Sequence, residues 1–359
     1  MARVSVLIVT YESSESITAV LESLNRQAYR DFDVVLVDNA SKDETKARVE
    51  TFKAVSTYPL TTVYLEENRG FAGGNNIAFS HARGEYIALL NPDARAAEMW
   101  LQELTENLDR DTKAGICASR VLTWDGSAID SAGDILLSTL RVFKRESPHN
   151  SRYKQREYVF SACAAAAMYR REMIDKIGFF DEDFFLQCED TDLSMRAQIA
   201  GWKILYLPEA VVYHEVGHSI GRASATGIYY SQRNMEFLRM KYLPASLLLK
   251  NLPQMLFGFT ADLIYFGLRQ KKPGVFLRAK FDALKMAGLM LKKRKDLSNS
   301  IKAVDNTYLR SLVTPLFMNK SLIKMKLVKL TPVSWSERQR APQSQSKRFL
   351  SRIFSIAKR

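Results

Sequence analysis

A fourfold alternation of apolar runs with helical segments in the first 93 residues constrains the fold of this chain most strongly. The apolar runs cover residues 4–10, 33–37, 61–65 and 87–90, and the helical spacings cover 15–27, 42–52 and 77–82. Continuous apolar runs of this length are typical of parallel strands buried on both faces. The alternation therefore predicts an α/β fold whose parallel strands are joined by right-handed crossovers.

Polar residues follow each of these predicted strands. Thr10 and Tyr11 end the first, Asp38 ends the second, a glycine-rich loop at 68–76 follows the third, and Asp93 follows the fourth. Ligands of open α/β sheets bind at the carboxyl ends of the strands, so these residues predict a nucleotide site. The first strand is not followed by the GxGxxG fingerprint, which argues against an NAD-dependent oxidoreductase. Asp93 taken alone could equally be a turn residue or a helix cap.

The glycine-rich loop itself suggests phosphate binding. Gly70, Gly73 and Gly74 allow close approach of the backbone, and Asn75 and Asn76 are placed to cap a following helix near a phosphate.

The length of the chain and its cysteines indicate the number of domains and the cell compartment. The length of 359 residues suffices for one sizeable core and a second, smaller part. Cys117, Cys163 and Cys188 are widely spaced and odd in number, which favours a reducing compartment over a disulfide framework or a zinc site.

Charge divides the chain into an acidic body and a basic tail. The net charge of +13 separates into −8 for residues 1–238 and +21 for residues 239–359. Such asymmetry points to a polyanionic partner of the tail, either a nucleic acid or an anionic membrane surface. The sequence contains no recognition-helix, zinc-finger or RNA-binding motif, so we expect no nucleic acid partner.

Several ordered motifs resemble those of one enzyme family. The segments are VTYES, VDNAS, NRGFAGGNN, LLNPDA, GFFDEDFFLQCEDTDLSMRAQIAGW and HEVGHS. They are similar to family 2 glycosyltransferases of the GT-A fold, and within that family to bacterial rhamnosyltransferases of surface-polysaccharide synthesis. The resemblance covers roughly residues 3–235. It implies a Rossmann-like, mixed but mainly parallel sheet flanked by helices in a domain of residues 1–240, with a helical C-terminal extension.

The resemblance also implies a metal site for Mg²⁺ or Mn²⁺. Asp93 would be the metal-binding carboxylate of the DxD-type motif, and Asn91 stands where the first Asp of that motif often lies. His214 would complete the metal site or touch the diphosphate, and His218 is a weaker candidate. A divalent ion suits a diphosphate leaving group because hard oxygen ligands and charge neutralisation are both required.

The donor site follows from the same resemblance. Asp38 would bond the base or ribose, Thr10 and Tyr11 would line the base pocket, and Arg69 would meet phosphate or be a solvated loop charge. The full set expected to bind the donor is Thr10, Tyr11, Asp38, Arg69, Gly70, Gly73, Asn75, Asn91 and Arg233. For Arg233 an ordinary helix face is the alternative.

Three carboxylates, Glu189, Asp190 and Asp192, crowd the start of a predicted helix that ends near residue 201. Acidic residues favour the first turn of a helix, and Asp192 with Arg196 forms an i,i+4 pair, so a structural role is expected for Asp192. Asp190 occupies the second position of the family's ED motif, where the general base resides. The implied reaction is a direct displacement that inverts the anomeric configuration.

Residues 241–330 are predicted to be helical, basic and membrane-associating, and residues 331–359 to be a basic flexible tail. Lys250 and Asp262 interrupt the apolar stretch, which leaves no run of the 18 to 20 residues that a membrane span requires. Amphipathic helices with basic flanks suit an anionic bilayer surface, while a helical cap or a dimer contact is the alternative.

The expected activity is therefore an inverting, metal-dependent transfer of rhamnose from dTDP-rhamnose to a lipid-linked saccharide acceptor. The enzyme would act as a peripheral protein at the cytoplasmic face of the bacterial inner membrane. UDP-galactofuranose or a UDP-hexose is the alternative nucleotide-sugar donor, and a non-enzymatic nucleic-acid-binding protein is the remote alternative.

Overall fold

The structure, a computed structural model, describes residues 2–215, 224–301 and 304–315. The predicted strands of the amino-terminal part all form, and a helix follows each of the first three. The elements there are β1 (Val4–Thr10), α1 (Ile17–Asn25), β2 (Phe32–Asp38), α2 (Thr45–Lys53), β3 (Leu60–Tyr64), α3 (Gly70–His81), β4 (Tyr86–Leu90), β5 (Ala94–Ala96) and α4 (Trp100–Arg110).

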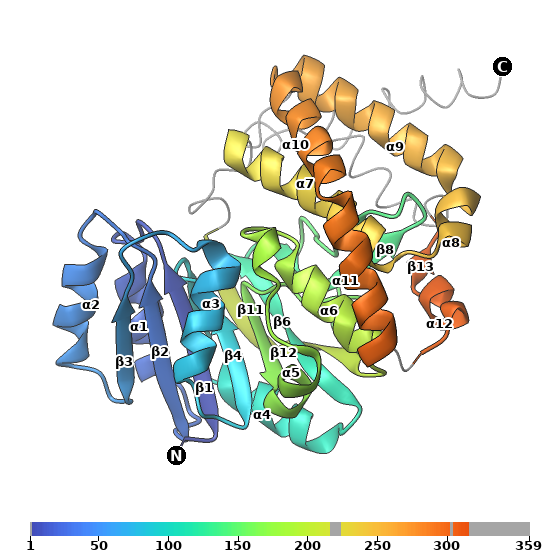
Figure 1. Cartoon of the computed structure of the whole chain (residues 1–359). Coiled ribbons are helices and arrows are strands. Elements are labelled where there is room, and N and C mark those ends of the chain that lie inside the picture. The colour runs from blue at the N-terminus through green and yellow to red at the C-terminus, as the bar shows by residue number, and fades with distance from the viewer. Residues whose placement is uncertain (1, 216–223, 302–303, 316–359) are drawn as a thin grey trace, which may run out of the picture. The chain divides into compact units, whose positions relative to one another are not determined.

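A single mixed sheet in the order β10-β12-β6-β11-β4-β1-β2-β3 carries this part of the chain (Figure 1). Four of its strands come later in the sequence, namely β6 (Ala114–Thr123), β10 (Glu157–Tyr158), β11 (Ala166–Arg170) and β12 (Lys203–His214). The strands β1 to β4 run parallel, and β6 and β12 run parallel to each other. The central strand β11 is antiparallel to both of its neighbours, β4 and β6, so the long strands on either side of it share one direction. The sheet is thus mainly parallel, as predicted, and the carboxyl ends of its long strands lie at one edge.

Helices cover both faces of the sheet, which explains the continuous apolar runs. On one face α1, α2 and α4 pack around Val4, Val6 and Ile8 of β1. On the other face α3, α5 (Arg171–Ile177) and α6 (Glu189–Ile199) cover Leu7 and Val9. Successive side chains of a strand point to opposite faces, so a strand buried on both sides needs apolar residues at every position.

The chain after α4 adds several short strands that no sequence pattern predicted. They form because of long-range pairing, with β7 on β6, β9 on β8, and β13 on β8. The elements are β6 (Ala114–Thr123), β7 (Ile129–Ser131), β8 (Asp134–Leu137), β9 (Val142–Lys144), β10 (Glu157–Tyr158), β11 (Ala166–Arg170), α5 (Arg171–Ile177), η1 (Glu182–Phe184), α6 (Glu189–Ile199) and β12 (Lys203–His214).

The C-terminal helices share a core with the sheet domain. Phe184 of η1, Met195 of α6, Phe237 of α7 and Met290 of α11 belong to one buried cluster. Residues 1–314 accordingly form one compact unit, and the boundary expected at residue 240 falls inside α7. The elements are α7 (Ala225–Tyr242), α8 (Ala245–Lys250), α9 (Leu252–Ile264), η2 (Tyr265–Arg269), α10 (Pro273–Lys285), α11 (Ala287–Ser300), α12 (Asn306–Ser311) and β13 (Val313–Thr314).

Within the described part of the chain, no helix has the length and apolar character needed to cross a bilayer. The tail predicted at 331–359 lies outside the described residues.

Candidate active site

Asp93 and His214 meet at the carboxyl edge of the sheet. The antiparallel pairing of β5 with β12 sets Ala94 opposite His214, and the backbone N–H of Glu215 donates to the Asp93 carbonyl at 2.9 Å. The Asp93 Oδ1 lies 3.2 Å from Nε2 of His214. Both residues are buried, with 2% and 8% of their surfaces exposed. The fold thus places a carboxylate and an imidazole side by side, although the two residues lie 121 positions apart in the sequence.

Asp130 of β7 contacts the second nitrogen of the same imidazole. Its Oδ2 lies 3.3 Å from Nδ1 of His214 and 3.0 Å from Nζ of Lys144. Burial opposes the charge of His214, but the bonds to Asp130 and Asp93 outweigh it and raise the pKa of the imidazole to about 9. Burial also disfavours the Asp130 carboxylate, yet Lys144 and His214 hold its pKa well below the usual range.

Asp190 lies in the first turn of α6, where backbone N–H groups are unsatisfied by the helix itself. Its Oδ2 accepts from the Ala164 N–H at 3.2 Å, and its Oδ1 accepts from the Thr191 N–H at 2.6 Å. Burial raises the pKa of Asp190, and these bonds offset part of the effect. A carboxylate so desolvated becomes a better proton acceptor near neutral pH.

One loop joins this carboxylate to the turn that carries Asp93. Ala164 bonds Asp190, and the carbonyl of the next residue, Ala165, accepts from the Asn91 N–H at 2.9 Å. The small side chains of residues 162–165 make this close approach possible. The two groups predicted from separate motifs are therefore brought together by adjacent residues of one loop.

Other ionisable groups surround Asp190. Burial raises the pKa of Glu189 well above its usual value, and the charge of Asp190 adds to the effect. Burial, then repulsion by Asp190, raises the pKa of Asp134 on β8 to about 7, although Ser161 donates to this carboxylate at 2.6 Å. Ionisation of Asp190 thus disfavours ionisation of the neighbouring carboxylates Glu189 and Asp134.

The backbone before α6 is strained and is held by α7. Phe185, Gln187 and Cys188 have φ values of 59°, 66° and 70°, in the left-handed region that non-glycine residues rarely adopt. The Asn234 amide donates to the carbonyls of Phe184, Leu186 and Gln187 at 2.7 to 2.9 Å. Asn234 thereby holds the backbone that leads into α6.

Arg233, expected to bind the donor, bonds to the same segment. Its Nη2 donates to the carbonyls of Asp183 and Phe184 at 2.7 and 3.2 Å. Its guanidinium also lies 4.9 Å from the ring centroid of Tyr230.

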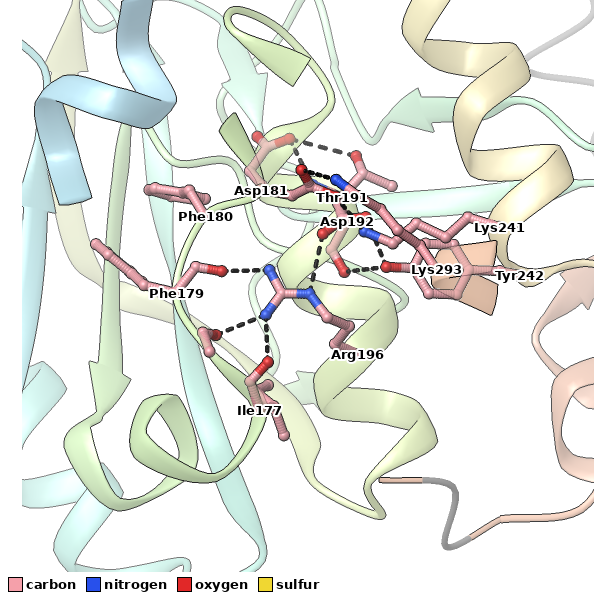
Figure 2. Close-up of polar contacts among 12 residues, drawn as sticks. Ile177, Phe179, Phe180, Asp181, Thr191, Asp192, Arg196, Lys241, Tyr242 and Lys293 are labelled. Atoms are coloured by element: carbon pink, nitrogen blue, oxygen red, sulfur yellow. Dashed lines mark hydrogen bonds and ion pairs between the residues drawn. The ribbon is translucent and has the colours of Figure 1, made fainter. Parts of the chain in front are cut away.

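Asp192 lies on the buried side of α6 and takes part in a separate network (Figure 2). It accepts from Arg196 Nε at 2.9 Å and from Lys241 Nζ and the Tyr242 hydroxyl at 2.6 Å each. None of its surface is exposed. The predicted i,i+4 pair with Arg196 is confirmed, and it is part of a larger link between α6 and α7.

The network extends to α11 through Asp181. This carboxylate accepts from Lys241 at 2.7 Å and from Lys293 at 2.6 Å, and Lys293 also pairs with Asp183. Burial opposes ionisation of Asp181, but the two lysines lower its pKa to about 2. Figure 2 shows the side chains of Lys241 and Lys293 extending toward Asp181 and Asp192.

The residues expected to bind the base lie at the ends of β1 and β2. Thr10 is paired with Asp38 in the parallel register, and its hydroxyl donates to Asp38 Oδ1 at 2.9 Å. Ser41 donates to the same carboxylate through its N–H and its hydroxyl. Tyr11 follows with 49% of its surface exposed.

The glycine-rich segment differs from its prediction. The helix α3 begins at Gly70 and not at residue 77, so Asn75 and Asn76 lie inside it and cap nothing. Asn75 is buried and donates to the Phe71 carbonyl at 2.9 Å, while Asn76 donates to the Phe180 carbonyl at 3.0 Å. Tertiary contacts outweigh the low helix propensity of these residues.

The glycines of α3 provide room for other parts of the protein. Gly70 has φ +70°, and a Cβ there would lie 2.5 Å from the Phe185 carbonyl. A Cβ at Gly74 would lie 2.7 Å from Cγ1 of Val9, so only glycine fits against this strand. Arg69 precedes α3, pairs with Glu67 at 2.6 Å and lies near Gly73 in a surface pocket that also contains Glu182.

Comparison with known proteins agrees with this geometry. A sequence profile described as "Glycosyl transferase family 2" matches residues 5–178. The chain is 28% identical over 247 residues to the N-acetylglucosaminyl-diphospho-decaprenol L-rhamnosyltransferase of Mycobacterium tuberculosis, covering 62% of this chain and 78% of that protein. Residues 5–178 belong to glycosyl transferase family 2.

Two further similarities support the assignment. The chain is also 28% identical to the amylovoran biosynthesis glycosyltransferase AmsB of Erwinia amylovora, over 63% of this chain and 74% of the relative. Among solved structures it resembles the mannosyltransferase PcManGT of Pyrobaculum calidifontis in complex with GDP-Man and Mn²⁺, with a TM-score of 0.53, 20% identity, and coverage of 83% and 86% of the two chains. The GT-A fold expected from the motifs is thereby confirmed.

Three residues of the candidate site were not among the predicted site residues. Asp130, Lys144 and Asn234 reach it from β7, β9 and α7. Asn234 follows Arg233 within residues 3–235, which the family resemblance covers, so its place beside a predicted site residue was a signal. Asp130 and Lys144 lie on short strands without a motif, and only the pairing of β6 with β7 and β12, and of β8 with β9, reveals them. His218 lies outside the described residues.

Proposed function

We propose that this glycosyltransferase is a metal-dependent, inverting enzyme in which Asp190 is the general base. The observation that carries the proposal is the loop at Ala164 and Ala165, which bonds Asp190 on one side and the Asn91 turn on the other. It sets a desolvated carboxylate next to the turn that presents Asp93. Direct displacement at an anomeric carbon needs both a proton acceptor and a charged site for the leaving group.

The residues present fit a divalent ion. Asp93 Oδ1 and His214 Nε2 are buried and lie 3.2 Å apart, and both can ligate once the imidazole has given up its Nε2 proton to a bound metal. The described residues contain no set of three or more His, Cys, Asp or Glu side chains arranged around one metal position. Two protein ligands leave coordination positions for diphosphate oxygens and water, as is usual for Mg²⁺ and Mn²⁺ in phosphate-binding enzymes. When bound, the ion would neutralise charge on the departing diphosphate.

In the proposed reaction, Asp190 accepts the proton of an acceptor hydroxyl as its oxygen bonds to the anomeric carbon. The bond from that carbon to the diphosphate oxygen breaks on the opposite side, and the nucleoside diphosphate leaves with the electron pair. The configuration at the anomeric carbon is therefore inverted. The N–H groups of Ala164 and Thr191 hold the carboxylate in place during the transfer.

Asp38, Thr10 and Tyr11 are proposed to bind the base and ribose. The described hydrogen bonds occupy about three of the four acceptor positions of the Asp38 carboxylate, which leaves one for a donor group of the ligand. Arg69, Gly70, Gly73 and Asn91 are proposed to lie along the diphosphate. For Asn75 and Arg233 donor binding stays a prediction, because both side chains bond to protein carbonyls in this structure.

We propose rhamnose from dTDP-rhamnose as the transferred sugar and a lipid-linked saccharide of polysaccharide synthesis as the acceptor. The name of the mycobacterial relative, which states an L-rhamnosyltransferase acting on a diphospho-decaprenol, supports both assignments. UDP-galactofuranose and UDP-hexoses are the alternative donors. The test is donor hydrolysis with dTDP-rhamnose, UDP-galactofuranose and UDP-glucose at equal concentration with Mg²⁺ or Mn²⁺. Faster turnover of dTDP-rhamnose supports the assignment, and preference for either UDP-sugar replaces it.

The helices α9 to α11 are proposed to lie on the anionic cytoplasmic face of the bacterial inner membrane. Helix α9 is rich in Leu and Phe yet contains no buried residue. Phe257 on α9 and Leu284 on α10 are 66% and 69% exposed. Exposed basic residues flank these side chains, namely Arg269, Lys271, Arg278, Lys285, Lys292 and Lys295. Apolar contact with lipid and attraction to anionic headgroups act together on such a surface.

Flotation with liposomes tests this surface. The intact protein should float with phosphatidylglycerol-containing vesicles, and its binding should weaken at high salt. The double variant Phe257→Glu, Leu284→Glu should lose this binding. The control Val55→Glu changes an equally exposed apolar residue of the sheet domain and should leave flotation unchanged. Failure of the intact protein to float with anionic vesicles would favour a dimer contact for this surface.

A further inference from the structure

We propose that Asp130 is a positioning residue that fixes the imidazole of His214 so that its Nε2 faces the metal position. The inference rests on the proposed role of Asp93 and His214 as metal ligands. It adds a residue that no motif of the family resemblance contains, on a strand far from both ligands in the sequence.

The geometry of the imidazole carries the inference. Nδ1 of His214 faces Asp130 Oδ2 at 3.3 Å, and Nε2 faces Asp93 Oδ1 at 3.2 Å. An ionised carboxylate only accepts hydrogen bonds, so the nitrogen facing Asp130 must carry a proton. A neutral imidazole has a single N–H. When a divalent ion binds, the Nε2 proton would leave to solvent; with the remaining proton on Nδ1, the lone pair of Nε2 would then point to the position that Asp93 also faces.

Asp130 is itself held in place. Its Oδ2 lies 3.0 Å from Nζ of Lys144 on β9, and β7 is paired with β6 at residues Ser131 and Ile129. Lys144 supplies a positive charge to a carboxylate of which only 6% is exposed. A buried carboxylate needs such a partner to stay ionised. Lys144 therefore keeps Asp130 in the form that can accept from His214.

Outer carboxylates of this kind set the orientation and basicity of metal-binding histidines, and their loss typically weakens metal affinity about 10- to 100-fold. A general effect of negative charge is the competing explanation. Asp134 distinguishes the two at pH 8, above its pKa of about 7, because it is equally buried and lies on the next strand, but its carboxylate bonds Ser161 and not His214.

The first test uses the unaltered protein. In ¹⁵N-histidine NMR with saturating Mg²⁺, His214 should show a protonated Nδ1 and an unprotonated Nε2, with its signal assigned through a His214→Gln variant. An Nε2–H tautomer in the Mg²⁺-loaded protein would overturn the inference.

The second test is a double-mutant cycle in Mn²⁺ affinity, measured by the EPR signal of free Mn²⁺. Asp130→Asn should weaken Mn²⁺ binding about 10- to 100-fold, whereas Asp134→Asn should stay within about threefold. In a His214→Ala background, Asp130→Asn should have no further effect, because Asp130 acts through His214.

The outcomes separate the inference from the proposed function. Absence of Mn²⁺ binding by the unaltered protein would remove the metal site itself. Mn²⁺ binding that Asp130→Asn leaves unchanged, or that Asp130→Asn weakens equally in the His214→Ala background, would remove only the role of Asp130.

Discussion

Asp190 and Asp192 lie two residues apart on α6, yet their surroundings differ in kind. Asp192 accepts from two cations and a tyrosine hydroxyl and is fully buried. The hydrogen bonds described for Asp190 come from Ala164 N, Thr191 N and the Thr191 hydroxyl, and none of these donors is a cation. A charged partner at bonding distance stabilises the ionised form, whereas desolvation without one raises the pKa. The different surroundings of the two residues on one helix thus give Asp192 a structural role and leave Asp190 for the proposed catalytic role.

The largest expected effect on stability comes from breaking the Asp192 network. Asp192→Ala should lower the free energy of unfolding by about 3 to 5 kcal/mol, because Arg196 and Lys241 would remain buried without their counter-charge. Urea unfolding measures it, with the milder Asp192→Asn as a second variant. Glu172→Gln is the matched control, since Glu172 pairs with Lys176 in the same i,i+4 geometry but at the exposed surface. Equal losses for the buried and exposed pairs would contradict this account of Asp192.

The metal side of the proposed site should respond in turnover. Asp93→Ala should reduce turnover at least about a hundredfold, equivalent to roughly 2.7 kcal/mol, with the fold retained by circular dichroism. The measurement is sugar transfer in the presence of Mn²⁺, alongside the same assay of the unaltered enzyme in EDTA. Full activity in EDTA would show that no divalent ion is needed.

The depressed pKa of Asp181 predicts a pH dependence of stability. Its folded pKa of about 2 lies below the usual value of 3.8, so its contribution is present above pH 3.8 and is lost as the pH falls through 2. The contribution is about 2 kcal/mol. Urea unfolding at pH 5 and pH 2 should therefore show a steeper decline for the unaltered protein than for Asp181→Asn. Parallel declines would mean that the lysines do not stabilise this carboxylate.

A smaller effect is expected at the contact with α11. Lys293→Met should cost about 1 kcal/mol in the free energy of unfolding, because Asp181 keeps its bond to Lys241 and Lys293 is half-buried. The measurement is thermal unfolding of Lys293→Met. The control is Lys292→Met, which makes the same change at the exposed neighbouring residue. A loss as large as that of Asp192→Ala would show that α11 is a principal support of α6.

The sheet and the ends of its first four strands could be predicted from the sequence because local patterns specify them. The apolar runs give β1 to β4, and the motifs around Asp93, Asp190 and His214 mark positions that the structure brings to one edge. The start of α3 could not be predicted, because its Gly and Asn residues have low helix propensity and form a helix through contacts with Val9 and Phe185.

Contacts distant in sequence account for the other differences. Asp130 meets His214 across 84 positions, and Lys241 meets Asp192 across 49. The basic charge beyond residue 239 suggested only an external polyanion, yet Lys241 and Lys293 pair with carboxylates of the protein itself. A charge count shows asymmetry but not which charges neutralise one another.

The central claim is that Asp190, and not Asp192, takes the acceptor proton. The most direct measurement is single-turnover sugar transfer by Asp190→Asn and Asp192→Asn under conditions where both are folded. Asp190→Asn should reduce the rate about a thousandfold with donor affinity nearly unchanged, because its amide cannot accept the proton. Asp192→Asn should retain a rate within about tenfold of the unaltered enzyme, since the described bonds of its carboxylate go to Arg196, Lys241 and Tyr242, which support α6. The reverse order of the two rates would contradict the assignment of the base.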